Sequence, residues 1–201
     1  MLYYIFNVLF TQLNVNPVEQ ITCFLYCIER MITTYQINDV IIYGAQGVCK
    51  IEEIIEKNIC NNKIEYYVLK PIYDEKSTIF VPINNKALTA KMKQALTSNE
   101  VYEIIKDMPN EETIWIDNEN VRKEKYREII SNGSRKELVQ LIKTLYLYKQ
   151  KQLNNGKRLH NVDDAFLKEA EKLLYDEFAL VLNIKREDVL PFILEKINEV
   201  K

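Results

Sequence analysis

The amino-acid pattern changes from strand-like to helical near Pro82, and this change limits the folds open to the chain. Before it, β-branched and aromatic residues form runs of strand length at 35–43, 48–56, 64–71 and 77–82. Glycine and asparagine separate these runs, at 44–47 and 58–62, because both residue types tolerate the positive φ of tight reversals. Short strands close together in sequence predict a small antiparallel barrel.

The pattern after Pro82 predicts helices only. Apolar residues recur at helical spacing over 98–108, 117–132, 134–153, 163–181 and 185–199. A capping residue precedes or opens the first four of these segments, namely Ser98, Asp117, Ser134 and Asp163 or Asp164. We therefore predict an α+β protein, with a Tudor-like or SH3-like antiparallel β-barrel over 31–97 and an all-α helical domain over 98–201.

Residues 1–30 differ from the rest of the chain. They are apolar and aromatic, with no Lys or Arg before Arg30, and the run from Met1 to Phe10 is too short to cross a bilayer. We expect this extension to come from an upstream start codon, so that the native protein begins at or near Met31. A helix that covers the barrel is the alternative. Cys23 and Cys27 are expected to be free, buried thiols.

Positive charge is concentrated in one segment of an otherwise slightly acidic chain. The formal net charge is −2, but Arg122 to Arg158 contains eleven basic residues and three acidic ones. Two predicted helices and the following loop share this excess, which would give phosphate groups a continuous positive surface. The alternative is a solvated helix face. We expect sequence-tolerant DNA binding through the following residues: Arg122, Lys123, Lys125, Arg127, Arg135, Lys136, Lys143, Lys157 and Arg158.

The sequence contains no recognisable catalytic or metal-binding motif. Gly44-Ala45-Gln46-Gly47 lacks the Lys-Ser/Thr ending of a phosphate-binding loop. The four cysteines lack zinc-ligand spacing, and the single histidine, His160, is expected to be a surface or packing residue. We therefore predict a protein that is not an enzyme and has no cofactor and no metal site.

Several short segments resemble the CarD family of bacterial transcription regulators. They are Asn38-Asp39-Val40-Ile41-Ile42-Tyr43-Gly44, Gly47-Val48-Cys49-Lys50-Ile51, Glu65-Tyr66-Tyr67-Val68-Leu69-Lys70 and Thr78-Ile79-Phe80-Val81-Pro82. The resemblance runs from about residue 33 to about residue 195. The amino-terminal domain of that family also occurs in the transcription-repair coupling factor.

The resemblance implies positions for two binding surfaces. The family's barrel docks on the RNA polymerase β subunit, and Lys57, Phe80, Val81 and Pro82 occupy the corresponding positions. In the family a tryptophan at the start of a basic helix acts as a wedge in the DNA minor groove at the edge of the transcription bubble. Trp115, the only tryptophan of the chain, matches it, although Ile116 to Val121 separate it from Arg122-Lys123. Core burial is the alternative for Phe80 and for Trp115.

These observations predict a monomeric transcription regulator located in the bacterial cytoplasm, with the nucleoid. Its barrel would bind the RNA polymerase β subunit and its helical domain promoter DNA, so that it modulates open-complex stability. The alternative is an adaptor that binds only protein, in which the basic face is merely solvated. No membrane association is expected.

Overall fold

A computed structural model describes residues 35–59, 62–74, 76–132 and 134–199, and residues 37–201 group into one compact unit. The expectations for residues 1–30, including the start at Met31 and the thiols of Cys23 and Cys27, lie outside the described residues. Cys60 also lies outside them. Cys49 is buried and is a free thiol, and its burial raises its pKa to about 12.

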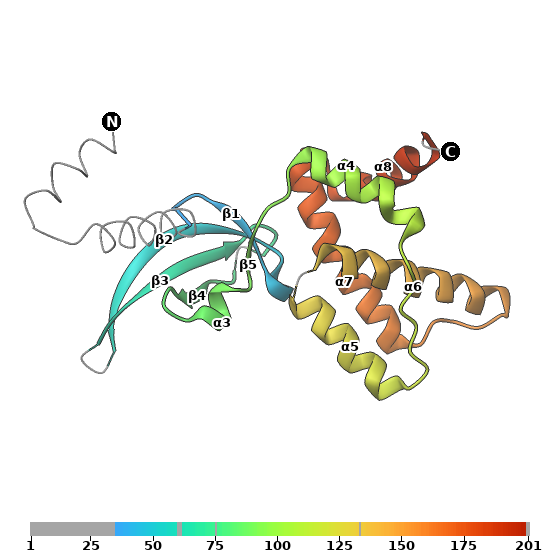
Figure 1. Ribbon diagram of the computed structural model, residues 1–201, viewed down its shortest axis with the longest axis horizontal. Helices are drawn as coiled ribbons and strands as arrows, with labels where there is room; N and C mark the ends of the chain where they lie inside the picture. Colours follow the sequence, from blue (N-terminus) through green and yellow to red (C-terminus); the bar gives the residue numbers. More distant parts are fainter. Residues whose placement is uncertain (1–34, 60–61, 75, 133, 200–201) are drawn as a thin grey trace, which may run out of the picture. The chain divides into compact units, whose positions relative to one another are not determined.

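The amino-terminal half forms a five-stranded antiparallel sheet (Figure 1). Its strands are β1 (Val40–Tyr43), β2 (Val48–Ile59), β3 (Asn62–Pro71), β4 (Ile79–Pro82) and β5 (Met92–Gln94). Their order in the sheet is β4-β3-β2-β1-β5, so β4 and β5 lie at its two edges. A register shift between Ile51 and Glu53 marks a bulge in β2. The sheet is thus built from neighbouring hairpins, with β5 added beside β1.

One face of the sheet is buried along four of its strands, although Val68, which points to the other face, is also buried. Side chains of successive strand residues point to opposite faces. Ile41, Ile51, Leu69 and Val81 have 0% exposure and occupy the buried positions of four strands. Phe80, next to Val81, is 44% exposed on the opposite face of β4.

Helices dominate the chain after β4. They are α3 (Lys86–Thr89), α4 (Ser98–Asp107), α5 (Glu119–Asn132), α6 (Arg135–Asn154), α7 (Asn161–Leu182) and α8 (Arg186–Glu199), and a short 3-10 turn, η2 (Met108–Asn110), follows α4. Another 3-10 turn, η1 (Gly44–Gln46), lies between β1 and β2. Thr97 caps α4 in a capping box with Glu100, and Ser134 caps α6. The Asn118 side chain accepts hydrogen bonds from the backbone N–H of Asn120 and of Val121 at the start of α5.

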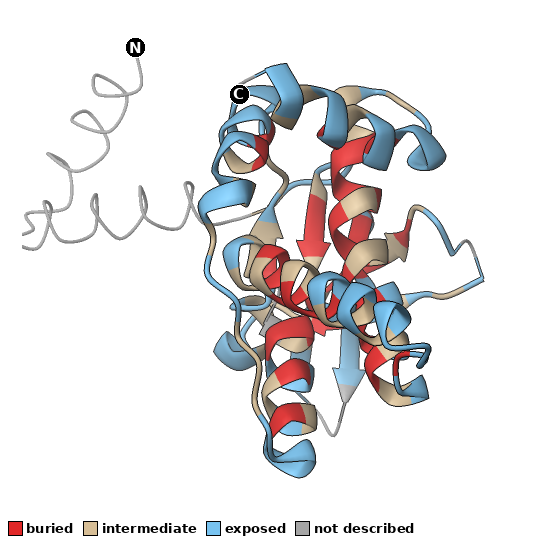
Figure 2. Ribbon diagram, turned by 90° about the vertical axis from the view of Figure 1, so that its right-hand side faces the viewer, coloured by how far each residue is buried: buried red, intermediate tan, exposed pale blue. Residues whose placement is uncertain are grey.

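Two apolar clusters hold the helices together. The first joins α5, α6 and α7 around Tyr126, Ile129, Leu141 and Leu145. The second joins α4, α7 and α8 around Ile105, Phe178 and Val189. Figure 2 shows buried residues along the inner sides of the helices and exposed residues along their outer sides. Because α7 contributes to both clusters, it is the central element of the helical region.

Contacts also join the sheet to the helices. Gly44 approaches α5 so closely that an added Cβ would lie 2.9 Å from the Ser131 carbonyl oxygen. Arg135 of α6 donates hydrogen bonds to Glu177 of α7, at 3.1 and 2.8 Å, and to the Gln94 carbonyl of β5, at 2.7 Å. Glu177 Oε1 also accepts a hydrogen bond from the backbone N–H of Leu96. Arg135 of α6 and the buried Glu177 of α7 therefore connect the end of β5 to both helices.

The predicted α+β class is confirmed, as are the antiparallel sheet and the helical region that follows it. The expectation of helices alone after Pro82 is wrong, because β5 lies between α3 and α4. Its sequence, Met92-Lys93-Gln94, carries no β-branched residue, and pairing with β1 rather than local propensity makes it a strand. The break expected at 58–62 is shorter, because β2 extends to Ile59 and β3 begins at Asn62.

Candidate functional site

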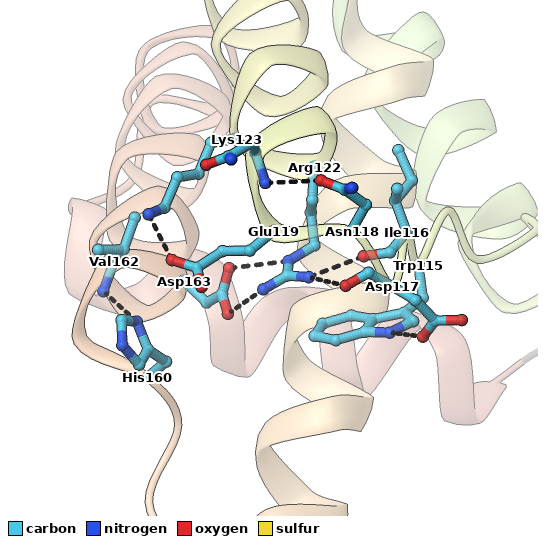
Figure 3. Close-up of polar contacts among 11 residues, drawn as sticks. Trp115, Ile116, Asp117, Asn118, Glu119, Arg122, Lys123, His160, Val162 and Asp163 are labelled. Carbon is cyan, nitrogen blue, oxygen red and sulfur yellow. Dashed lines mark hydrogen bonds and ion pairs between the residues drawn. The ribbon is translucent and has the colours of Figure 1, made fainter.

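Trp115 lies in the segment between η2 and α5, and Figure 3 shows its indole beside Arg122 and Asp117. The Tyr148 ring of α6 stacks on the indole, with centroids 3.7 Å apart and planes 17° apart. The Arg122 guanidinium carbon lies 4.4 Å from the ring centroid, and since the tyrosine fills one face, the guanidinium covers the other. The indole N–H donates to the Asp117 carboxylate at 3.0 Å. The side chain is half-buried against the first apolar cluster.

Arg122, which was expected to contact phosphate, lies in the interior of the helical region. Its side chain is 9% exposed and that of Asp163 on α7 is 3% exposed. The guanidinium donates two hydrogen bonds of 3.2 Å to this carboxylate (Figure 3). It donates two more to the carbonyls of Ile116, at 2.7 Å, and Asp117, at 3.3 Å. Arg122 is therefore an internal anchor of the Trp115 segment, because a buried cation requires a buried acceptor set.

Lys143 and Arg135 also have internal partners instead of the solvent-facing position expected of phosphate contacts. The Lys143 ammonium donates to the carbonyls of Pro109 and Glu111, each at 2.6 Å, and to that of Met108 at 3.4 Å. It thereby satisfies carbonyls at the end of the η2 turn. Arg135 is engaged with Glu177 and Gln94, as described above. Both side chains therefore connect parts of the fold to one another.

Three further basic residues of the expected surface form partly exposed ion pairs. Lys123 pairs with Glu119, and its hydrogen bond lowers the pKa of that carboxyl. Lys125 pairs with Glu128 at 3.2 Å and with Glu137 at 3.4 Å. Lys136, whose side chain is 70% exposed, lies 3.6 Å from Glu111. Pairs of this kind contribute little stability, so their cations can exchange a carboxylate for another anion.

Arg127, Lys157 and Arg158 are exposed, and none of their side chains forms an ion pair or a hydrogen bond with the part of the chain that the structure describes. Arg127 lies on α5, and Lys157 and Arg158 lie in the loop between α6 and α7. Among the expected DNA contacts, these three are the cations most available to an external anion.

The structure brings Lys57 and Phe80, two of the expected polymerase contacts, together on the exposed face of the sheet. Lys57 lies on β2 and Phe80 on β4, on either side of β3. The Lys57 ammonium lies 3.8 Å from the Phe80 ring centroid and 5.9 Å from that of Tyr66 on β3. This cation–π arrangement places the Lys57 ammonium next to an aromatic side chain of the edge strand β4.

The other two residues of that group have different positions. Val81 is fully buried, because it faces the core when Phe80 faces solvent, so its side chain is not available to a partner. Pro82 is half-buried at the end of β4, opposite Tyr66. Tyr66 therefore belongs to the same surface as Lys57 and Phe80, although sequence reasoning did not single it out.

Sequence reasoning also missed the partners of Trp115. Asp163 was considered only as a helix cap, and Tyr148 was not singled out. Nothing in their spacing indicates that both meet a segment about 30 or more residues earlier in the chain. His160 was expected to be a surface or packing residue. It is exposed and precedes α7, where its Nδ1 accepts a weak hydrogen bond of 3.5 Å from the Val162 N–H.

Comparison with known protein families gives two matches. Residues 35–93 match the CarD-like/TRCF RID domain, and residues 100–193 match the C-terminal domain of CarD. Together they cover the sheet and most of the helical region. No curated protein matches the chain. Among the described residues, no helix is both long enough and apolar enough to cross a bilayer.

Proposed function

Because the chain belongs to the CarD family, whose members are non-enzymatic transcription regulators that interact with RNA polymerase, we propose that it stabilises open promoter complexes. In this proposal the sheet binds the polymerase β subunit, and the helical region binds promoter DNA at the upstream edge of the bubble. A protein that binds the open complex more tightly than the closed one shifts the population toward melted promoter. Its location would be the cytoplasm, with the nucleoid.

The contact between Lys57 and Phe80 is the observation that carries the docking proposal. Phe80 is 44% exposed and lies on a strand that pairs with β3 alone among the described strands. An open edge of this kind can add a strand from a partner, while exposed side chains next to it provide specificity. An exposed aromatic ring beside a cation is typical of an interface anchor.

The helical region offers a DNA surface without base-reading groups. Arg127, Lys157 and Arg158 are available to phosphates, and the ammonium groups of Lys123, Lys125 and Lys136 can be released from exposed pairs. Such contacts position DNA but carry no direct sequence information. Trp115 is proposed to meet the minor groove, where an apolar side chain stabilises unstacked base steps.

The docking proposal is tested with purified RNA polymerase in a pull-down. The double variant Lys57→Glu/Phe80→Glu is expected to lose most of the bound polymerase, because it reverses a charge and removes the aromatic anchor. Tyr146→Glu is the matched control, because Tyr146 is 52% exposed on α6. DNA binding by the isolated protein should be unchanged in both variants. Full retention of polymerase by a folded double variant would rule out this surface.

An adaptor that binds only protein is the second candidate. The internal positions of Arg122, Arg135 and Lys143 favour it, because they remove three cations from the expected DNA surface. Duplex DNA binding that weakens with salt and depends on Arg127 would exclude this candidate. No DNA binding at low salt would support it.

A further inference from the structure

We propose that Tyr148 and Arg122 are positioning residues, which hold the Trp115 indole so that only its edge is presented to DNA. This inference rests on the proposed function and adds to it the residues that determine how the tryptophan is used. Three observations support this proposal. Both faces of the indole ring are covered, the backbone on both sides of Trp115 is hydrogen-bonded to helices, and the Arg122–Asp163 ion pair is buried.

The two covered faces determine which part of the indole can meet a ligand. Tyr148 stacks at 3.7 Å and Arg122 lies at 4.4 Å, so neither face is open to a base. The half-buried side chain therefore makes any external contact through its ring edge. A ring covered in this way cannot stack between two bases unless it leaves its partners. An edge contact in a groove requires no such movement.

Hydrogen bonds connect the backbone around Trp115 directly to α5 and α6, and indirectly, through Arg122, to α7. The Ile114 N–H donates to the Thr144 hydroxyl of α6 at 2.8 Å. Arg122 of α5 binds the carbonyls of Ile116 and Asp117, and Asp163 of α7 fixes the guanidinium from the other side (Figure 3). One guanidinium thus holds the indole face and the backbone that follows it.

A fixed indole has an energetic consequence for DNA binding. Ordering a mobile aromatic side chain at an interface reduces affinity, and a side chain already held in its bound position avoids this loss. The same contacts could also serve only the stability of the free protein. The two roles differ in one respect: a positioning residue acts on DNA through Trp115 and has no effect on it when Trp115 is absent.

The experiment is a double-mutant cycle on the lifetime of a promoter open complex with RNA polymerase. Tyr148→Leu removes the stacked ring, and Tyr148→Phe is the matched control that keeps it. Each is combined with Trp115→Ala. Because Trp115 is the only tryptophan, acrylamide quenching of its fluorescence reports indole exposure in the free protein. Thermal unfolding identifies any variant that is not folded, and Arg122→Lys, which keeps the charge but loses the planar fork, then replaces Tyr148→Leu in the cycle.

We expect Tyr148→Leu to increase quenching and to shorten the lifetime by about two- to tenfold relative to Tyr148→Phe, the range that an aromatic pair supports. In the Trp115→Ala background it should shorten the lifetime no further. An equal shortening in both backgrounds would overturn the positioning role while leaving the proposed function intact. The positioning role would also be overturned if Trp115→Ala shortened the open-complex lifetime and Tyr148→Leu did not. An unchanged lifetime for Trp115→Ala would contradict the wedge, and the positioning role with it.

Discussion

Arg122 and Arg127 lie on the same helix, α5, yet their surroundings give them different roles. Arg122 is 7% exposed and shares a buried ion pair with Asp163, whereas Arg127 is exposed to solvent. In the sequence both belong to one basic segment. Their burial, which depends on how α5 packs against α7, distinguishes a structural cation from an available one.

The two arginines therefore give a paired prediction. Arg122→Ala should lower the free energy of unfolding by about 3–5 kcal/mol, because it leaves the Asp163 carboxylate buried without its partner. Arg127→Ala should leave stability nearly unchanged and reduce the salt slope of DNA binding by about one unit. Urea unfolding and salt-dependent DNA titration of the two variants check this. Equal effects of both variants on stability would contradict the assignment.

Asp176 gives a prediction for pH. It is 2% exposed on α7, and burial raises the pKa of its carboxyl, although Arg186 and Lys172 oppose the shift. A carboxyl whose pKa is higher in the folded state binds more protons there, so its contribution to stability decreases as pH rises through that window. Relative to Asp176→Asn, the wild-type protein should therefore gain stability as pH falls from 7 toward 4. Urea unfolding of both proteins over this range tests it, and a relative loss at low pH would contradict it.

At the scale of elements, the 3-10 turn η1 is one of the places where the sheet meets the helices. The sequence predicts a turn at 44–47 from glycine, and the structure has Gly44 at φ +46° and Gly47 at φ +71°. The sequence does not show that the turn packs against α5 and α7. An added Cβ on Gly47 would lie 3.2 Å from the Leu173 side chain of α7, so that the turn packs closely there, and its positive φ also disfavours a side chain.

Gly44→Ala should lower the free energy of unfolding by about 2–5 kcal/mol, because positive φ and overlap with the Ser131 carbonyl both oppose a Cβ. Gly156→Ala is the control, since Gly156 has φ +68° but no atom within 4 Å of an added Cβ. It should cost only the backbone term, about 1–2 kcal/mol. Chemical denaturation measures both. A cost for Gly44→Ala no greater than that for Gly156→Ala would argue against tight packing of the turn.

Some elements of the fold could be predicted from local sequence signals and others could not. Helices with strong caps and apolar stripes, such as α6 after Ser134, follow from sequence. β5 does not, because its three residues become a strand only through pairing with β1. The site divides in the same way: Trp115, Lys57 and Phe80 could be selected from sequence, but Tyr148 and Asp163 could not, because their contacts span about 30 or more residues.

At the scale of the whole molecule, residues 37–201 form one compact unit in which the sheet and the helices are tied together. Glu177 binds Arg135 and the Leu96 N–H, and the Tyr73 hydroxyl donates to the Asp176 carbonyl at 3.2 Å. These contacts link the strand region that carries Phe80 to the helical region that carries Trp115. The surface around Phe80 and the segment around Trp115 therefore belong to one compact unit.

The most direct test of this account is the lifetime of a promoter open complex formed by purified RNA polymerase and challenged with competitor DNA. The wild-type protein should lengthen that lifetime, and both Lys57→Glu/Phe80→Glu and Trp115→Ala should remove most of the effect. The first variant should fail because polymerase docking is lost, and the second while polymerase remains bound. An unchanged lifetime in the presence of wild-type protein that remains bound to polymerase would contradict the account.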